Sequence, residues 1–178
     1  MAINPNIYLV GPMGAGKTTI GKRIAEIKGM NFVDSDNEIE KRTGVDISFI
    51  FDMEGEEGFR RREREIIAEL TELPNTVLAT GGGAVLEAET RDLLSARGVV
   101  VYLETSLEQQ LARTRNSKDR PLLEGSDDVE ATLRQLMEER DPLYRGIADL
   151  VVTTGDQPAR KLAREIVENL ESIGTAEL

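Results

Sequence analysis

The sequence predicts an α/β fold in which helices cover both faces of a parallel sheet. Short apolar runs rich in valine, isoleucine and leucine recur with few polar interruptions, as in parallel strands buried on both sides. Longer stretches with the period of an amphipathic helix separate these runs. Gly29, Gly44 and Gly98 fall just after helical stretches, where helices commonly end. Strands and helices in alternation predict right-handed crossovers between parallel strands.

The apolar runs are the expected strands, and the helical stretches lie between them. Strands are expected at residues 7–10, 31–33, 76–79, 99–103 and 150–153. Helices are expected near residues 17–28, 36–42, 57–73, 89–96, 107–114, 129–140 and 158–173. A chain of 178 residues is long enough for one complete core, so we expect a single domain over residues 1–178.

Residues 11–18 read GPMGAGKT and match the phosphate-binding loop G-x-x-x-x-G-K-[ST], or P-loop. An apolar run precedes the motif and a helical stretch follows it, which is the strand–loop–helix context that the motif requires. Its glycines let the backbone wrap around phosphates, which then meet N–H groups and a helix N-terminus. Lys17 is expected to reach the β- and γ-phosphates, and the Thr18 hydroxyl to ligate Mg²⁺. This context disfavours the alternative, a glycine-rich turn that binds nothing.

Composition excludes several kinds of site and partner. The chain has no cysteine and therefore no disulfide, thiolate nucleophile or zinc–thiolate site. It has no histidine, so its chemistry must use carboxylates, Lys, Arg, hydroxyls and backbone, which suits phosphoryl transfer. A formal net charge of −11 argues against nucleic acid or an anionic membrane as the main partner. No transmembrane run or signal peptide is evident, so we expect a cytoplasmic protein, with a monomer as the default.

Two further motifs follow expected strand ends, where ligands bind in parallel α/β sheets. In Asp34-Ser35-Asp36, one carboxylate can hold Mg²⁺ through water while the other accepts a proton from a substrate hydroxyl. The same residues also suit an ordinary helix N-cap, and both roles can hold at once. Gly81-Gly82-Gly83 indicates backbone close to a ligand, with N–H groups that can bind an anion; a flexible turn is the alternative.

Arginines of interest lie in three parts of the sequence. Residues 60–64 read RRRER and open a long helix, where most of them are expected on a solvated, ion-paired face. Arg113 and Arg120 lie in and before the polar segment 117–128, a predicted mobile loop or lid. A lid cation would stabilise charge on the γ-phosphoryl group, although a basic surface loop is the simpler alternative. Arg140 ends an expected helix, where the helix dipole alone would favour it.

Taken together, these motifs resemble shikimate kinase. Their order and spacing match that family over residues 6–170: GPMGAGKT, Asp34-Ser35-Asp36, Gly58-Phe59-Arg60 with Glu63, Thr80-Gly81-Gly82-Gly83, Arg120-Pro121-Leu122-Leu123 and Arg140. The P-loop alone is unspecific, whereas the whole set is highly specific. The resemblance implies a P-loop kinase fold with strand order 2-3-1-4-5, a substrate-binding region at 34–64 and a lid at 113–125.

The resemblance also implies an activity, the transfer of the γ-phosphoryl group of ATP to the 3-hydroxyl of shikimate. It implies that Asp36 helps to deprotonate that hydroxyl, that Arg120 is the lid cation and that Asp34 holds Mg²⁺ through water. The implied shikimate ligands are Asp36, Arg60, Glu63, Gly82 and Arg140. The guanidinium groups of the two arginines suit the carboxylate of shikimate. The implied ATP ligands are Gly14, Ala15, Gly16, Lys17, Thr18, Thr19, Arg113, Arg120 and Gln157.

Two alternatives remain open at this point. Another small-metabolite kinase of the same fold, such as one for gluconate, would not need the Arg60, Gly82 and Arg140 set. A nucleotide-binding regulatory protein without catalysis would be expected to have lost a catalytic or metal-binding residue. All of them are present: Lys17, Thr18, Asp34, Asp36 and Arg120.

Overall fold

The computed structural model describes residues 4–114 and 128–176, and its strands form a five-stranded parallel sheet. The strands are β1 (Asn6–Val10), β2 (Asn31–Asp34), β3 (Thr76–Ala79), β4 (Gly98–Glu104) and β5 (Leu150–Thr153). Their order is β2-β3-β1-β4-β5, and every neighbouring pair is parallel. Both the predicted fold class and the strand order are therefore confirmed.

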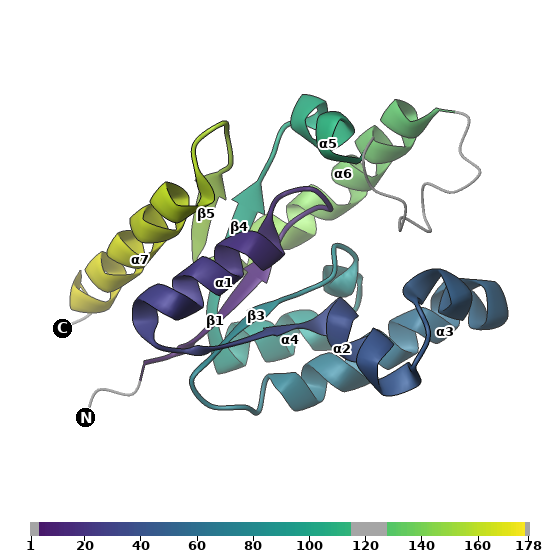
Figure 1. Cartoon of the computed structure of the whole chain (residues 1–178), viewed down its shortest axis with the longest axis horizontal. Helices are drawn as coiled ribbons and strands as arrows, with labels where there is room; N and C mark the ends of the chain where they lie inside the picture. Colours follow the sequence, from purple (N-terminus) through teal and green to yellow (C-terminus); the bar gives the residue numbers. More distant parts are fainter. Residues whose placement is uncertain (1–3, 115–127, 177–178) are drawn as a thin grey trace.

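Helices form the outer layers of the fold (Figure 1). They are α1 (Lys17–Lys28), α2 (Ser35–Thr43), α3 (Ile47–Leu70), the short 3₁₀ helix η1 (Ala84–Leu86), α4 (Ala88–Arg97), α5 (Leu107–Thr114), α6 (Val129–Ile147) and α7 (Ala159–Ala176). Helices α1 and α7 pack against each other on one face of the sheet, while α3, α4 and α6 contribute to the core on the other. No helix in the described ranges is long and apolar enough to cross a membrane.

The central strand β1 explains why the core has two halves. Its side chains alternate between faces, as the pleat of a strand requires. Ile7 and Leu9 pack into the cluster that includes α1 and α7, whereas Tyr8 and Val10 pack into the cluster on the opposite face. All four are buried, with 0–1% of their surface exposed. A strand buried on both sides has no polar face, which is why the sequence reads as a continuous apolar run.

Helix α6 continues past the predicted end at Arg140. Proline lacks an N–H group and its ring obstructs one helical hydrogen bond, so Pro142 was expected to follow the helix end. The helix nevertheless runs on to Ile147 because the turn after the proline is packed: Tyr144 is fully buried and Leu143 lies against the core. The prediction was wrong because tertiary burial outweighed one lost backbone hydrogen bond.

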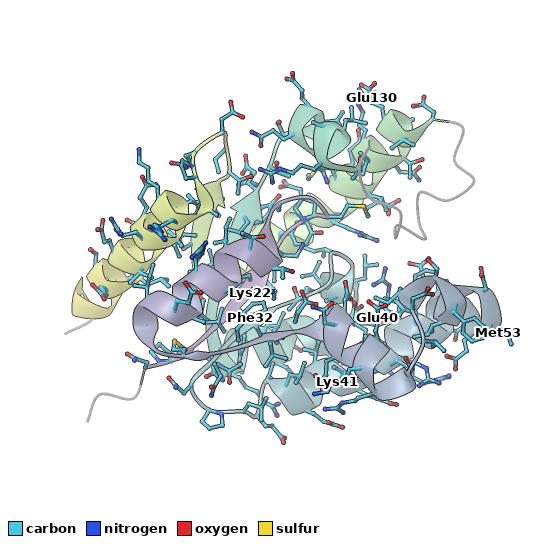
Figure 2. All side chains as sticks on the ribbon, in the orientation of Figure 1. Lys22, Phe32, Glu40, Lys41, Met53 and Glu130 are labelled. Atoms are coloured by element: carbon cyan, nitrogen blue, oxygen red, sulfur yellow. The ribbon has the colours of Figure 1, made fainter. Side chains whose placement is uncertain are left out.

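Helix α3 begins ten residues earlier than predicted, at Ile47 rather than near residue 57. The Asp46 side chain caps this end by accepting a hydrogen bond from the Phe49 N–H at 2.9 Å. Gly55 then kinks the helix with φ 72° and ψ 179°, which divides it into two pieces. Met53, near the end of the first piece, is 69% exposed (Figure 2). The mixed exposure of this piece explains why it lacked a clear helical pattern.

Candidate active site

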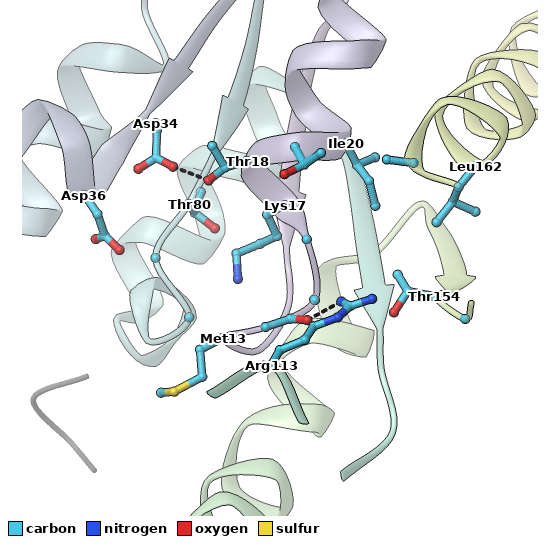
Figure 3. Close-up of a pocket in the computed structure, with 18 of the residues that line it drawn as sticks. Met13, Lys17, Thr18, Ile20, Asp34, Asp36, Thr80, Arg113, Thr154 and Leu162 are labelled. Atoms are coloured by element: carbon cyan, nitrogen blue, oxygen red, sulfur yellow. Dashed lines mark hydrogen bonds between the residues drawn. The ribbon is translucent and has the colours of Figure 1, made fainter. Parts of the chain in front are cut away.

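A cavity of about 470 Å³ lies at the carboxyl edge of the sheet, where the loops after β1, β2 and β3 meet (Figure 3). Most of the predicted site residues line it: Gly14, Ala15, Gly16, Lys17, Thr18, Thr19, Asp34, Asp36, Gly82, Arg113 and Gln157. The parallel topology brings these residues together, because strands that run in one direction end at one edge.

The P-loop has a backbone shape that depends on glycine, as two of its positions show. Gly11 has φ 146°, and a Cβ there would lie 2.5 Å from the Leu103 carbonyl oxygen. Gly16 has φ 89°, in the left-handed region, and directly precedes the first residue of α1. A side chain at either position would be strained or obstructed. The glycines thereby turn the chain so that the N-terminus of α1 faces the cavity.

Lys17 and Thr18 place a cation and a hydroxyl beside the loop. The Lys17 ammonium donates hydrogen bonds to the carbonyl oxygens of Gly11 at 2.5 Å and Pro12 at 3.0 Å. The Thr18 hydroxyl donates to Oδ2 of Asp34 at 2.6 Å, across the gap between α1 and β2 (Figure 3). A hydroxyl and a carboxylate in contact are hard oxygen donors of the kind that Mg²⁺ prefers. Their position beside a P-loop fits a magnesium ion shared with nucleotide phosphates.

Asp34 takes one of the two roles that its motif suggested, the helix cap, and its second carboxylate oxygen contacts Thr18. While Oδ2 accepts from Thr18, Oδ1 accepts from the Asn37 N–H at 3.1 Å and so caps helix α2. The cap orients the carboxylate toward α1, since its geometry is set by the first turn of the helix. No cluster of three or more His, Cys, Asp or Glu side chains suited to a metal occurs among residues 4–114 and 128–176. Further oxygen ligands would therefore come from phosphate and water, as is usual for Mg²⁺.

Asp36 points away from Asp34, toward Gly81 and Glu63. A Cβ on Gly81 would lie 2.8 Å from Oδ1 of Asp36 and 2.7 Å from Oε2 of Glu63, so only glycine fits between them. Oδ1 of Asp36 is buried and accepts no hydrogen bond within the described structure. Burial, followed by repulsion from the carboxylates of Glu63 and Asp34, raises the pKa of Asp36 to about 7, against the opposing effect of nearby Lys17. Such a carboxyl group can take up a proton near neutral pH.

Arg60 and Glu63 form a buried ion pair one turn apart on α3, at 2.8 Å and with 8% and 2% of their surfaces exposed. Burial raises the pKa of Glu63, and Arg60 opposes that shift. The Arg60 guanidinium lies so close to Gly83 that a Cβ there would collide with it. Arg60 and Asp36 therefore both lie against the glycine loop Gly81-Gly82-Gly83.

Arg140 approaches the glycine loop from α6. Its Nη1 lies 3.6 Å from where a Cβ on Gly82 would be, and only 4% of the residue is exposed. Arg140 forms no ion pair with any carboxylate of the described residues, and its Nε has no hydrogen-bond partner there. Burying a guanidinium without a counter-anion is costly. The arrangement therefore suits an anionic ligand at Gly82, between Arg140 and Arg60.

Helix α5 lies against the outer side of the P-loop. Gln110 donates from Nε2 to the Met13 carbonyl oxygen at 3.0 Å, and Arg113 donates to the carbonyl oxygen of Gly14 (Figure 3). Gln157 lines the cavity from the loop after β5, and Arg113 lines it from α5. Arg120 and residues 115–125 of the predicted lid lie outside the described residues.

Sequence reasoning missed three side chains that hold the site in place: Ser35, Gln110 and Tyr144. Ser35 accepts the Gly81 N–H at 3.1 Å, and Tyr144 donates its hydroxyl hydrogen to the Gly82 carbonyl oxygen at 2.5 Å. A signal for Tyr144 was present, because it lies four residues after Arg140 and hence on the same helix face. Nothing in the local sequence indicated the contact of Gln110 with a loop far away in the chain.

Comparison with known proteins agrees with the geometry. The family model of shikimate kinase matches residues 13–171. A shikimate kinase of Pseudoalteromonas translucida is 56% identical over 171 residues, which cover 96% of this chain and 99% of the relative. Shikimate kinase 1 of Yersinia pestis is 57% identical over 172 residues, or 97% and 99% of the two chains. The structure of a shikimate kinase from Acinetobacter baumannii in complex with shikimate superposes with a TM-score of 0.93, at 52% identity, covering 95% and 94%.

Proposed function

Because the chain belongs to the shikimate kinase family, it transfers the γ-phosphoryl group of ATP to the 3-hydroxyl of shikimate, and we propose which residues carry out this transfer. The products are shikimate 3-phosphate and ADP, in the biosynthesis of chorismate and the aromatic amino acids. One observation carries the residue assignment. The buried Arg140, which has no carboxylate partner in the described structure, and the proton acceptor Asp36 contact the same glycine loop at the edge of the P-loop cavity.

We propose that the phosphates of ATP bind to the P-loop residues 14–19. The N–H groups at the start of α1 supply local positive potential on a chain whose net charge is −11. Lys17 would exchange its contacts with the loop carbonyls for contacts with the β- and γ-phosphates. Arg113 and Gln157 would border the adenine, and Arg120 would act as the lid cation.

We propose Mg²⁺ as the metal of the reaction, with Thr18 as a direct ligand and Asp34 as a ligand through water. The 2.6 Å contact between these two side chains supports the assignment, since it brings two hard oxygen donors to one point. When bound, the ion neutralises charge that develops on the β- and γ-phosphoryl oxygens. The N-cap of α2 holds Asp34 in place for this role.

We propose that shikimate lies with its carboxylate on Arg60, Arg140 and the Gly82 N–H, and with its hydroxyls on Asp36 and Glu63. Two guanidinium groups and an N–H suit a carboxylate. Asp36 would accept the proton of the attacking hydroxyl, as the rise of its pKa to about 7 allows. The ion pair with Arg60 would orient Glu63 beside the hydroxyls.

We further propose that residues 1–178 act as one domain and as a monomer in the cytoplasm, where ATP is available. The single sheet and the two cores that share it support one domain. Light scattering coupled to size exclusion should give a mass near 19.7 kDa for the monomer. A mass twice as large would refute the monomer.

A coupled ADP-release assay tests the reaction and its acceptor together. With ATP and Mg²⁺ present, ADP release is expected with shikimate, but not with quinate, gluconate or a blank without acceptor. Release only with another acceptor would keep the nucleotide site and refute the assignment of Arg60, Gly82 and Arg140.

A matching assay with EDTA in place of Mg²⁺ is expected to show no turnover, and full activity there would refute the metal.

Replacing Arg140 by alanine is expected to raise KM for shikimate about 100-fold. The substitution would remove the guanidinium that pairs with the carboxylate of bound shikimate, and truncating one partner of a buried charge pair costs about 2–5 kcal/mol. The KM for ATP should change little, since Arg140 does not line the P-loop cavity. Initial rates measured over a range of each substrate separate the two effects. Arg134→Ala is the matched control, because that arginine lies on the same helix but is exposed and paired with Glu130. An unchanged KM for shikimate in Arg140→Ala would refute the carboxylate site.

A further inference from the structure

The loop Gly81-Gly82-Gly83 is held from two sides by side chains that the proposed mechanism does not use. Ser35, the first residue of α2, accepts the Gly81 N–H at 3.1 Å. Tyr144, on α6, donates its hydroxyl to the Gly82 carbonyl oxygen at 2.5 Å. Both residues are fully buried, with 0% of their surfaces exposed. These contacts join the loop after β3 to one helix on each side of the cavity.

The hydrogen bonds of the loop leave the Gly82 N–H for a ligand. The Gly81 N–H binds Ser35, the Gly81 carbonyl accepts from the Ala84 N–H at 3.1 Å, and the Gly82 carbonyl accepts from Tyr144. None of the hydrogen bonds among the described residues uses the N–H of Gly82 or that of Gly83, and Gly83 does not line the cavity. Gly82 lines the cavity and lies near Arg140. Hydrogen bonds therefore fix the N–H and carbonyl of Gly81 and the carbonyl of Gly82, while the Gly82 N–H stays available.

Such support is needed because glycines do not determine their own conformation. Three consecutive glycines have a wide choice of backbone angles, and ordering them costs more entropy than ordering other residues. A binding group that must be ordered at the moment of binding loses part of its affinity. Burial raises the pKa of Tyr144 to about 12, so its hydroxyl remains protonated and can donate throughout the working range of pH.

We propose that Ser35 and Tyr144 are positioning residues that set the Gly82 N–H for the carboxylate of the acceptor. Tyr144 has a second connection to that site, because its hydroxyl also interacts with Arg140, one turn earlier on α6. The two side chains thus couple the loop to α2 on one side and to α6 on the other. This inference rests on the proposed carboxylate site at Gly82 and Arg140.

The test removes each hydroxyl without removing the rest of the side chain's packing. Tyr144→Phe and Ser35→Ala are each expected to raise KM for shikimate about tenfold, the upper range for one net hydrogen bond. The kcat and the KM for ATP should stay within about twofold of wild type, because neither hydroxyl contacts the P-loop. Tyr102→Phe is the matched control: its ring packs at a tilt against that of Tyr144, with the ring centroids 4.9 Å apart, but its hydroxyl donates to Asp141 instead of the loop. That control should leave both KM values unchanged.

A second substrate separates failure of this inference from failure of the site. The methyl ester of shikimate lacks the carboxylate charge, so wild type should discriminate strongly against it, and Tyr144→Phe and Ser35→Ala should discriminate about tenfold less. If wild type treats acid and ester alike, the carboxylate site itself is wrong. If wild type discriminates and the variants keep the same ratio, with a lowered melting temperature as their only change, the hydroxyls are structural and the inference fails. Should Tyr144→Phe not fold, Ser35→Ala decides between these outcomes alone.

Discussion

Replacing Lys17 by methionine is expected to lower kcat about 1000-fold, the loss seen when one preorganised donor to a developing charge is removed. Methionine keeps an unbranched side chain of similar length but carries no charge. The Lys17 ammonium contacts the carbonyls of Gly11 and Pro12 at the mouth of the P-loop, so it lies where the β- and γ-phosphates of ATP are proposed to bind. Steady-state ADP release at saturating shikimate measures the effect.

The fold of this variant should persist, because Lys17 lies in the first turn of α1 and belongs to neither core cluster. Circular dichroism and a thermal melt check this point. Lys22→Met is the matched control on the same helix: its ammonium lies 5.9 Å from the Phe32 ring centroid, away from the cavity (Figure 2). The control should retain wild-type kcat. A Lys17→Met enzyme with near-normal kcat would refute the role of the lysine.

The parts of this fold that sequence predicts well are those in which local pattern and tertiary environment agree. Strands β1, β3 and most of β4 are buried and have mainly apolar sequences, and all five strands begin and end within about one residue of their expected bounds. The P-loop carries its own geometry in Gly11 and Gly16, whose positive φ values require glycine. Asp34 and Asp36 end up on different neighbours, as two carboxylates flanking a strand end can do.

The parts that sequence predicts poorly depend on contacts between distant segments. Pro142 is a helix-stopping signal locally, yet the buried Tyr144 beyond it keeps α6 helical. Asp46 caps the start of the first piece of α3. Apolar residues in this piece do not all face the core, since Met53 is exposed, so their spacing does not follow the helical period. Ser35 reads as a helix-start residue, and only the fold brings the Gly81 N–H, 46 residues away, to its hydroxyl. Such pairings have no local signature because they are created by the crossover connections.

Replacing Asp36 by asparagine is expected to lower kcat about 1000-fold, within the range for loss of a positioned general base. Asparagine has nearly the same shape but cannot accept the proton of the attacking hydroxyl. Shikimate-dependent ADP release measures the effect, as for Lys17. Asp52→Asn is the control, because Asp52 is an exposed carboxylate on α3. If Asp36→Asn retains near-normal kcat, another group must accept the proton.

The same substitution should make the free protein more stable at pH 8, which is the opposite of its effect on activity. The pKa of Asp36 is raised from 3.8 to about 7, chiefly by burial and then by Glu63 and Asp34, so the folded state disfavours the ionised form. A shift of that size corresponds to at most about 4 kcal/mol of unfolding free energy. The unfolded chain releases this proton near pH 3.8 and the folded chain near pH 7. The destabilisation therefore grows as pH rises through that window and is complete above it.

Urea unfolding of wild type and Asp36→Asn, without nucleotide and with EDTA, measures this difference directly. The variant should be more stable by several kcal/mol at pH 8, and its advantage should shrink as pH falls toward 4, where Asp36 is protonated in the folded state and begins to be protonated in the unfolded chain as well. Equal stabilities at pH 8 would mean that the Asp36 pKa is ordinary in the folded protein. A catalytic base held above its usual pKa reduces the stability of the fold. An inactive but more stable variant is therefore the combined result that this site predicts.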